Sequence, residues 1–159
     1  MQASVAAFLA TVPIGVLATE RPDGTIRQSA AYFSADGAAI FLSTERQRAK
    51  ARDVARTGRA SLCVVGSAPP YPSVTVEGRA RLLDSDIADT TAKIFMKMTG
   101  KTQQFTDDQL AAMGRVLIRI DVERAYGASY LPEARGDDHG ATTEATPASA
   151  ALPGPTSAG

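Results

Sequence analysis

Two tight-turn sequences divide the first third of the chain into three short segments that suit β-strands. Residues 21–24 read RPDG, and residues 35–37 read ADG. Glycine tolerates the left-handed backbone of tight turns, and aspartate hydrogen-bonds to the turn backbone. Such short connections join neighbouring strands in antiparallel fashion, so residues 14–20, 25–34 and 38–44 are predicted to form a meander.

The later segments continue this β pattern. Apolar and polar residues alternate through residues 73–83, which indicates a strand with one wet face. Strands are also predicted at 60–65 and 115–127, and helices at 2–11, after Thr44, at 84–98, and at 106–113 with Thr106 and Gln109 spaced as a capping box. Six strands with little helix between them favour a mainly β (α+β) fold, a small closed antiparallel barrel.

Composition limits the size and location of this fold. A chain of 159 residues with 44% hydrophobic content suits one domain, which we place at 1–131. Residues 132–159 are rich in Ala, Pro, Thr and Ser and are predicted to be a flexible tail. Cys63 is the single cysteine, which excludes an intrachain disulfide and favours the cytoplasm. The chain shows neither a signal peptide nor an apolar run of about 18 residues, so no membrane association is expected.

The charged residues are balanced overall but unevenly placed. The chain has 17 basic and 17 acidic residues, so no global field draws it to nucleic acid. Residues 43–59, STERQRAKARDVARTGR, nevertheless hold a cluster of cations. Thr44 and Gln47 have capping-box spacing, which predicts a helix whose first free N–H groups lie beside Arg48 and Lys50. That arrangement would bind phosphate, although a solvated basic face and a nucleic-acid contact remain alternatives.

The sequence lacks the residues that several other kinds of functional site require. The single histidine, His139, lies in the predicted tail, so the domain offers neither the usual zinc ligands nor a histidine to activate a serine or cysteine. No GxGxxG or GxxxxGK[ST] loop occurs. An RNA or DNA binder would need an aromatic stacking platform that the strands do not show. We therefore expect no metal and no nucleic-acid partner.

The chain resembles the split-barrel flavin and deazaflavin oxidoreductases, the pyridoxamine-phosphate-oxidase-like superfamily, in the order of four segments: LATERPDGTIRQSAAYF, IFLSTERQRAKARDVARTGRASLCVV, VTVEGRARLL and VLIRIDVERAYG. It is most similar to the actinobacterial branch that uses the deazaflavin coenzyme F420. The resemblance implies a six-stranded split barrel and a homodimer with the cofactor between its subunits. It also implies an oxidoreductase that transfers a hydride from reduced F420 to a small unsaturated or conjugated substrate.

The resemblance further implies which residues hold the cofactor. Arg48 and Lys50 match the pair that binds its phosphate, with Ala49 between two cations that are adjacent in the oxidases. Gln28 replaces a basic residue of the oxidases, which weakens the case for FMN, and Arg52 and Arg56 prolong the stripe begun by Arg48 toward the carboxylates of F420. The full set of expected cofactor-binding residues is Gln28, Ser29, Ala30, Ser43, Thr44, Arg48, Lys50, Arg52 and Ser73. Ser73 falls near a polar position that the family's second subunit contributes, and an exposed strand hydroxyl is the alternative for it.

The sequence says less about the substrate and the catalytic residues than about the cofactor. The chain has no Trp, and its lone His is in the tail, so it lacks the substrate-grasping extension of true pyridoxamine-phosphate oxidases. Tyr32, Tyr71 and Tyr126 are candidate proton donors, although such residues commonly serve packing, and no catalytic residue is assigned. FMN is the alternative cofactor, and a flavin or tetrapyrrole carrier without turnover is the alternative function, because one fold serves many functions.

Overall fold

A computed structural model describes residues 1–127 of the chain, so the tail predicted at 132–159 lies outside the described residues. The six predicted strands are present and form one closed antiparallel barrel in the order β1-β2-β3-β6-β5-β4. This confirms the split-barrel expectation. The strands are β1 (Ile14–Glu20), β2 (Ile26–Asp36), β3 (Ala39–Glu45), β4 (Arg59–Val65), β5 (Ser73–Leu83) and β6 (Arg115–Tyr126).

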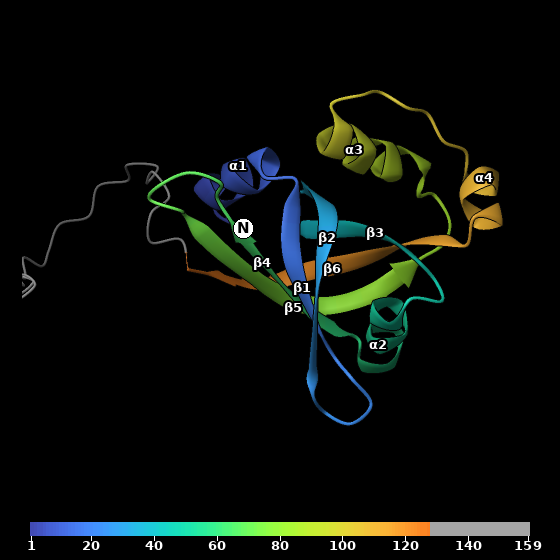
Figure 1. The fold of residues 1–159 in the computed structure, drawn as a ribbon, viewed down its shortest axis with the longest axis horizontal. Helices are drawn as coiled ribbons and strands as arrows, with labels where there is room; N and C mark the ends of the chain where they lie inside the picture. Colours follow the sequence, from blue (N-terminus) through green and yellow to red (C-terminus); the bar gives the residue numbers. More distant parts are fainter. Residues whose placement is uncertain (128–159) are drawn as a thin grey trace, which may run out of the picture.

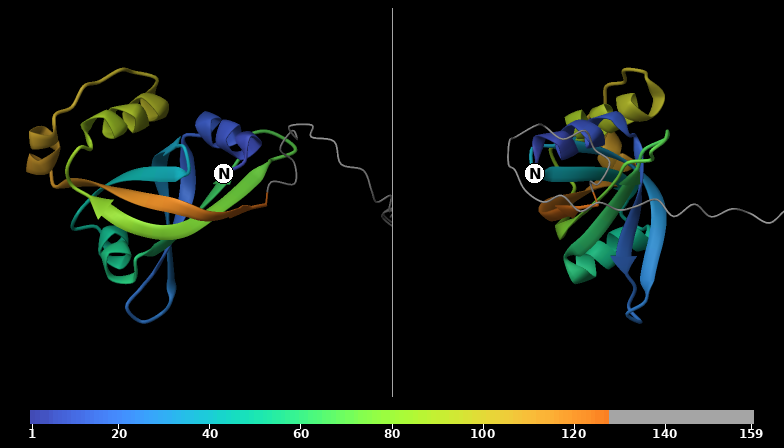
Figure 2. Two further views of the ribbon diagram at one scale, coloured as in Figure 1. Left: turned by 180° about the vertical axis from the view of Figure 1, so that it is seen from behind. Right: turned by 90° about the vertical axis from the view of Figure 1, so that its left-hand side faces the viewer.

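Four short helices surround the barrel. They are α1 (Ala3–Thr11), α2 (Ala49–Thr57), α3 (Ala88–Thr99) and α4 (Asp107–Ala112). Helices α1 and α3 lie on one side of the barrel and α2 lies on the opposite side (Figures 1 and 2). Among these helices, none has the length and apolarity needed to span a bilayer.

The barrel interior is filled by alternate residues of the strands. Burying these side chains supplies the main driving force for folding, and the alternation read from β5 is the pattern that places them inside. A second, smaller cluster, which contains Ile94 and Leu110, packs α3 and α4 against β6. Central members of the barrel core are Leu17, Phe33, Ile40, Leu42, Leu62, Val76, Ile118 and Ile120.

Helix α2 begins later than predicted, and the capping box at Thr44 and Gln47 is wrong. Thr44 remains in β3, where it pairs with Val116, because the β3–β6 ladder continues to Glu45. The Gln47 side chain donates to the Glu45 carboxylate instead of capping a helix. Arg48 is the residue before α2, with extended backbone and no side-chain cap. Tertiary strand pairing thus outweighs the local capping signal.

Helix α3 also begins later than predicted, at Ala88, because an acid from another helix caps it. The Asp107 carboxylate accepts hydrogen bonds from the backbone N–H groups of Asp86, Ile87 and Ala88 at 2.6, 3.0 and 2.9 Å. The capping box predicted at Thr106 and Gln109 is present and starts α4. The start of α4 is therefore fixed to the start of α3.

The barrel closes through a bend in β5. The β5–β6 register shifts between Glu77 and Gly78, and a Cβ atom on Gly78 would lie 1.9 Å from the Asp121 carbonyl oxygen. Only glycine allows the two backbones to approach this closely. A β-bulge of this kind gives the sheet the local twist that closure requires.

Candidate functional site

A groove runs from the middle of β2 and the end of β3 to the start of α2, and we call it the cation groove. Its volume is about 310 Å³, and it has two cationic side chains from the α2 region and a third, Arg115, from the start of β6. Five of the nine predicted cofactor-binding residues meet there, although they come from separate parts of the sequence. These five are Ala30, Ser43, Thr44, Arg48 and Lys50.

The charges in the cation groove suit an anion. Lys50 Nζ lies 3.4 Å from the Ala30 carbonyl oxygen, a weak contact for a full charge. Burial lowers the pKa of Lys50, and the nearby charge of Arg48 lowers it further. Arg48 Nε lies 3.5 Å from a Glu45 carboxylate oxygen, and its side chain is 65% exposed. Two like charges held this close would both be stabilised by a shared phosphate.

The start of α2 adds backbone donors to the cation groove. The first N–H groups of a helix have no intrahelical acceptor, and here they belong to Ala49 and Lys50. The positive end of the helix dipole lies at the same place. The predicted combination of a helix N-terminus with Arg48 and Lys50 is therefore present, although the helix starts later than the sequence suggested.

The other four predicted residues lie outside the cation groove. Gln28 is exposed on the same strand face as Ala30, and Ser29 points to the barrel interior, where its hydroxyl has no hydrogen-bond partner within residues 1–127. Ser73 begins β5 and pairs with Val65. Arg52 is exposed one helical turn beyond Arg48.

The basic stripe along α2 is shorter than the sequence suggested. Arg56 donates a hydrogen bond to the Glu20 backbone carbonyl and lies 3.9 Å from the carboxylate of the same residue. These contacts direct Arg56 toward the β1–β2 hairpin. Within residues 1–127, Arg52 makes no ion pair, although it does not line the cation groove.

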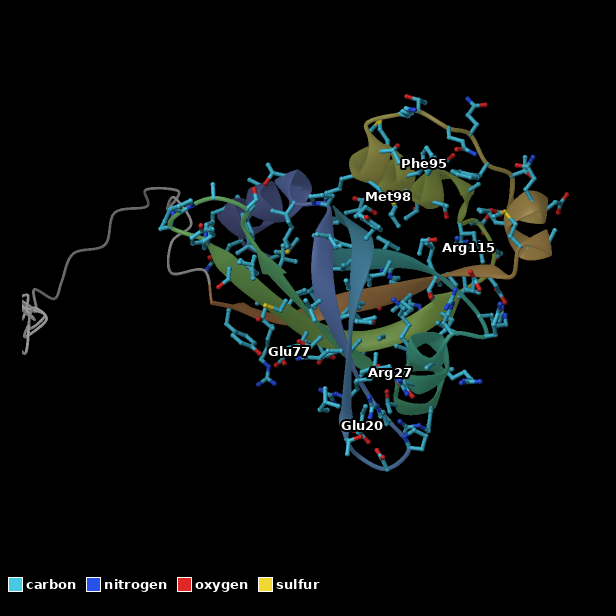
Figure 3. All side chains as sticks on the ribbon, viewed as in Figure 1. Glu20, Arg27, Glu77, Phe95, Met98 and Arg115 are labelled. Carbon is cyan, nitrogen blue, oxygen red and sulfur yellow. The ribbon has the colours of Figure 1, made fainter. Side chains whose placement is uncertain are left out.

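Asp53 positions α2, and sequence reasoning missed it. Its carboxylate is buried and accepts hydrogen bonds from Thr19 Oγ1 at 3.0 Å and from Arg27 Nε at 2.9 Å. Figure 3 shows Arg27 beside α2. The signal in the sequence was a single acid inside a run of cations, but its partners lie 26 and 34 residues away. Asp53 thereby fixes the helix that carries Lys50.

Two further residues of the cation groove are Tyr32 and Arg115. Tyr32 was one of three candidate proton donors. Of the others, Tyr71 lies in the β4–β5 connection and Tyr126 at the end of β6, and neither lines the groove. Arg115 was missed, because nothing local separates it from other arginines that begin or end a strand. It enters the groove through its pairing with Glu45 across the β3–β6 ladder.

The outer surface of the barrel next to the cation groove is unusually apolar. Strand pairing aligns Ala30, Val16, Cys63, Thr75 and Tyr126 in one row across β2, β1, β4, β5 and β6. We call this surface the outer face. Its exposed apolar side chains include Ile14, Val16, Tyr32, Val65 and Tyr126, each between 41% and 53% exposed. Ala30 and Tyr32 belong to both the outer face and the groove.

Comparison with known proteins agrees with this architecture. The family model for pyridoxamine 5'-phosphate oxidase matches residues 1–129. The chain belongs to this family. It is a flavin- or deazaflavin-type split-barrel protein of the oxidoreductase class, and the family binds flavin-type cofactors. No curated protein matches the chain.

Solved structures with the same fold have different described roles. A conserved hypothetical protein from Mycobacterium tuberculosis is 24% identical with a TM-score of 0.66, and the match covers 88% of this chain and 92% of that one. A structure named F420 reductase is 24% identical with a TM-score of 0.63, covering 76% and 94%. An FAD and heme binding protein from Mycobacterium smegmatis is 14% identical with a TM-score of 0.65, covering 85% and 75%. At these identities the similarity shows the shared fold.

Proposed function

We propose that the cation groove binds the phosphate of coenzyme F420 and that the protein uses the reduced coenzyme to transfer a hydride to a small unsaturated or conjugated molecule. The observation that carries this proposal is the meeting of Arg48, Lys50 and the start of α2 in one groove. The similarity to a structure named F420 reductase supports the choice of cofactor. The location in the cytoplasm stays a prediction from the sequence.

The residues of the groove have separate tasks in this proposal. The Arg48 guanidinium and the Lys50 ammonium bind the phosphate together with the free N–H groups of α2. Ser43 adds a hydroxyl group near the end of β3, whereas Thr44 lines the groove but is 5% exposed and lies on the opposite face of the strand. The small side chain of Ala30, exposed on β2, leaves room for a flat ring above the strand. When bound, the cofactor supplies the ring atom that carries the hydride.

Tyr32 is the proton donor that this geometry favours. Its side chain lines the cation groove, so Tyr32 lies beside the proposed cofactor site. Replacing Tyr32 with Phe should lower kcat while leaving cofactor affinity within about threefold, because the ring is kept and one hydroxyl is lost. Lost cofactor binding in that variant would instead assign Tyr32 to the ring site.

We further propose that a second copy of the chain packs on the outer face. Five exposed apolar side chains gather on this surface, and grouped exposed apolar residues commonly mark a protein–protein interface. Ala30 and Tyr32 continue that surface into the groove, so a partner there would form the missing wall of the site. Ser73, which is not part of the groove in its own subunit, would then be free to reach the partner's cofactor.

Two alternatives use the same groove. FMN ends at its phosphate, whereas F420 continues into a lactyl and oligoglutamate chain whose carboxylates could reach Arg52. A carrier that binds a flavin or tetrapyrrole without turnover is supported by the similarity to the FAD and heme binding protein. The three candidates differ in preferred ligand and in turnover, so one titration series separates them.

The test is titration of the purified protein with F420, FMN and hemin, followed by fluorescence or absorbance. F420 should bind most tightly, and Lys50→Ala should weaken both F420 and FMN at least about tenfold through loss of a charged contact. Arg52→Ala should weaken F420 more than FMN, and more so at low salt, because exposed charges are screened. Arg79→Ala, which removes another exposed arginine, is the matched control.

Each result that contradicts these expectations would favour a different cofactor, function or phosphate site. Equal or tighter binding of FMN would replace F420 with FMN. Tight binding of hemin with no turnover of either reduced cofactor would favour the carrier. Unchanged affinity in Lys50→Ala would reject the cation groove as the phosphate site. Arg56 is already bound to Glu20. Arg56→Ala should therefore change the relative affinity for F420 and FMN less than Arg52→Ala does.

A further inference from the structure

A second cavity adjoins the cation groove, and we call it the apolar pocket. It lies between α3, the segment that leads to α4, and the barrel, and its volume is about 400 Å³. That volume falls within the range of about 300–1,000 Å³ that is usual for small-molecule sites. Figure 3 shows Phe95 and Met98 on α3 above Arg115 at the start of β6. Most of the wall is apolar, with Phe95, Met98, Phe105, Leu110 and Met113 among its side chains.

The roof of the apolar pocket is held in place by several contacts. The rings of Phe95 and Phe105 meet edge to face with 5.8 Å between their centroids. Asp107 binds the backbone at the start of α3, as described above. At the other end of α3, Lys97 Nζ donates to the Leu9 carbonyl oxygen at 2.6 Å and lies 3.9 Å from the centroid of the Phe33 ring. The pocket is therefore formed before any ligand binds.

The apolar pocket and the cation groove share part of their walls. Tyr32, Ser43 and Arg115 line both cavities. A molecule in the pocket would therefore lie beside a molecule in the groove. This adjacency is what a reaction between a bound cofactor and a bound substrate requires, since reacting atoms must approach to about 3–3.5 Å.

Five polar residues line the apolar pocket, namely Tyr32, Ser43, Thr91, Gln103 and Arg115, and two of them are notable for their lack of partners among residues 1–127. Arg115 makes no ion pair within residues 1–127. Thr91 also lines the pocket and is 7% exposed, yet its hydroxyl has no hydrogen-bond partner among these residues. A buried polar group without a partner is costly, so such groups commonly serve a ligand. Both groups would be satisfied by an acceptor at the pocket wall.

We infer that the apolar pocket binds the substrate of the proposed reaction and that this substrate is a flat, apolar ring compound with one carbonyl or carboxylate group. The aromatic and methionine side chains contact the ring, and Arg115 binds the acceptor group. Within the described residues, one cation lines the pocket, so a phosphorylated substrate with two negative charges fits poorly. That the bound compound is a substrate rests on the proposed function, but its binding does not require a cofactor.

The test uses two naphthalene probes and the full-length protein without added cofactor. 2-Naphthoate carries a carboxylate, and 2-acetylnaphthalene carries a neutral carbonyl on the same ring system. Calorimetric titration should show one site for each probe. Arg115→Gln should weaken 2-naphthoate about tenfold and the neutral ketone about threefold or less, because the carboxylate loses an ion pair whereas the ketone loses only a hydrogen bond, which glutamine can partly replace. Arg79→Gln, on an exposed arginine of β5, should change neither.

A second pair of variants tests the apolar wall. Met98→Asp places a charge in the wall, whereas Met96→Asp places it on the same helix outside the pocket; the two side chains are partly exposed, at 38% and 50% for the residues. The neutral ketone should bind at least about fivefold more weakly to Met98→Asp and within about twofold of wild type to Met96→Asp. Thr91→Val should keep the melting temperature, because it removes an unpartnered hydroxyl, and should weaken the ketone.

The outcomes separate this inference from the proposed function. Probe binding that survives both Arg115→Gln and Met98→Asp, or no probe binding in a protein that binds F420 or FMN, would overturn the substrate pocket. Lys50→Ala should weaken cofactor binding at least about tenfold while 2-naphthoate binding stays within about twofold, because Lys50 does not line the pocket. Probe binding with the predicted variant effects, in a protein that binds no cofactor, would uphold the pocket and reject the proposed reaction.

Discussion

Asp53 joins α2 to the barrel, and its replacement by asparagine should loosen the helix that carries Lys50. Its carboxylate Oδ2 accepts from Thr19 Oγ1 at 3.0 Å and from Arg27 Nε at 2.9 Å. Asp53 and Thr19 are 4% and 3% exposed, so water does not readily replace their bond. The Arg27 side chain is 30% exposed and keeps part of its hydration.

The expected loss of stability follows from these contacts. A hydrogen bond to a charged group contributes about 1.5–3 kcal/mol to stability. Removing one partner of a fully buried ion pair, which leaves the other charge buried alone, costs about 3–5 kcal/mol. Asparagine keeps the size of the side chain and one acceptor, and Arg27 can still reach water. We therefore expect Asp53→Asn to lower the free energy of unfolding by about 2 kcal/mol near neutral pH.

The effect should depend on pH. Burial raises the pKa of the Asp53 carboxyl, but the hydrogen bonds from Arg27 and Thr19 and the charge of Arg27 lower it more, so the pKa lies below its usual range. A carboxyl with a lowered folded-state pKa stabilises the fold above its unfolded pKa of about 3.9, and that stabilisation is lost as pH falls through the folded value. The difference between wild type and Asp53→Asn should therefore shrink in acid.

The assay is urea unfolding followed by circular dichroism, for wild type, Asp53→Asn, Arg27→Gln and the double variant. The double-mutant cycle should give a coupling energy of about 1–2 kcal/mol between the two residues. FMN or F420 affinity should also fall in Asp53→Asn, although Asp53 does not line the groove. Equal unfolding free energies for wild type and Asp53→Asn near neutral pH, or additive single variants, would refute the proposed role.

Three further predictions concern the bend in β5, the proposed phosphate site and the outer face. Gly78→Ala should lower the free energy of unfolding by about 3 kcal/mol, because its Cβ would lie 1.9 Å from the Asp121 carbonyl oxygen. Gly24→Ala, with open space around it, should lower it by about 1 kcal/mol. Equal losses for the two variants in thermal unfolding would contradict the close approach of the two backbones at Gly78. FMN affinity should fall in alkaline solution because the pKa of Lys50 is lowered, mainly by burial, whereas Lys50→Arg should keep its affinity there; parallel pH profiles would exclude Lys50 as a ligand. Val16→Asp should give monomers in analytical ultracentrifugation with unchanged monomer folding, whereas Met96→Asp should not, and a dimer in both variants would place the subunit interface elsewhere.

Local patterns in the sequence determined the strands and named two residues of the proposed phosphate site. The turn at 21–24 and the alternation in β5 depend on residues close in the chain, and both appear in the structure. The turn predicted at 35–37 lies instead at residues 37–38, because Ala35 and Asp36 continue β2 and pair with β3. The capping box at Thr106 is equally local and is confirmed. Arg48 and Lys50 could be named because their charges and spacing are visible without any long-range contact. The resemblance of the chain to a known family suggested which cofactor such a pair of cations would bind.

Only the tertiary structure decided where these local pieces start, stop and meet. Pairing of β3 with β6 kept Thr44 in a strand and delayed α2 to Ala49, since ladder hydrogen bonds outweigh a weak capping preference. The same pairing brought Arg115 to the groove, and closure of the barrel brought Thr19 and Arg27 to Asp53. Such contacts join residues far apart in the chain, and their free energies depend on burial and register, which exist only after the barrel has closed.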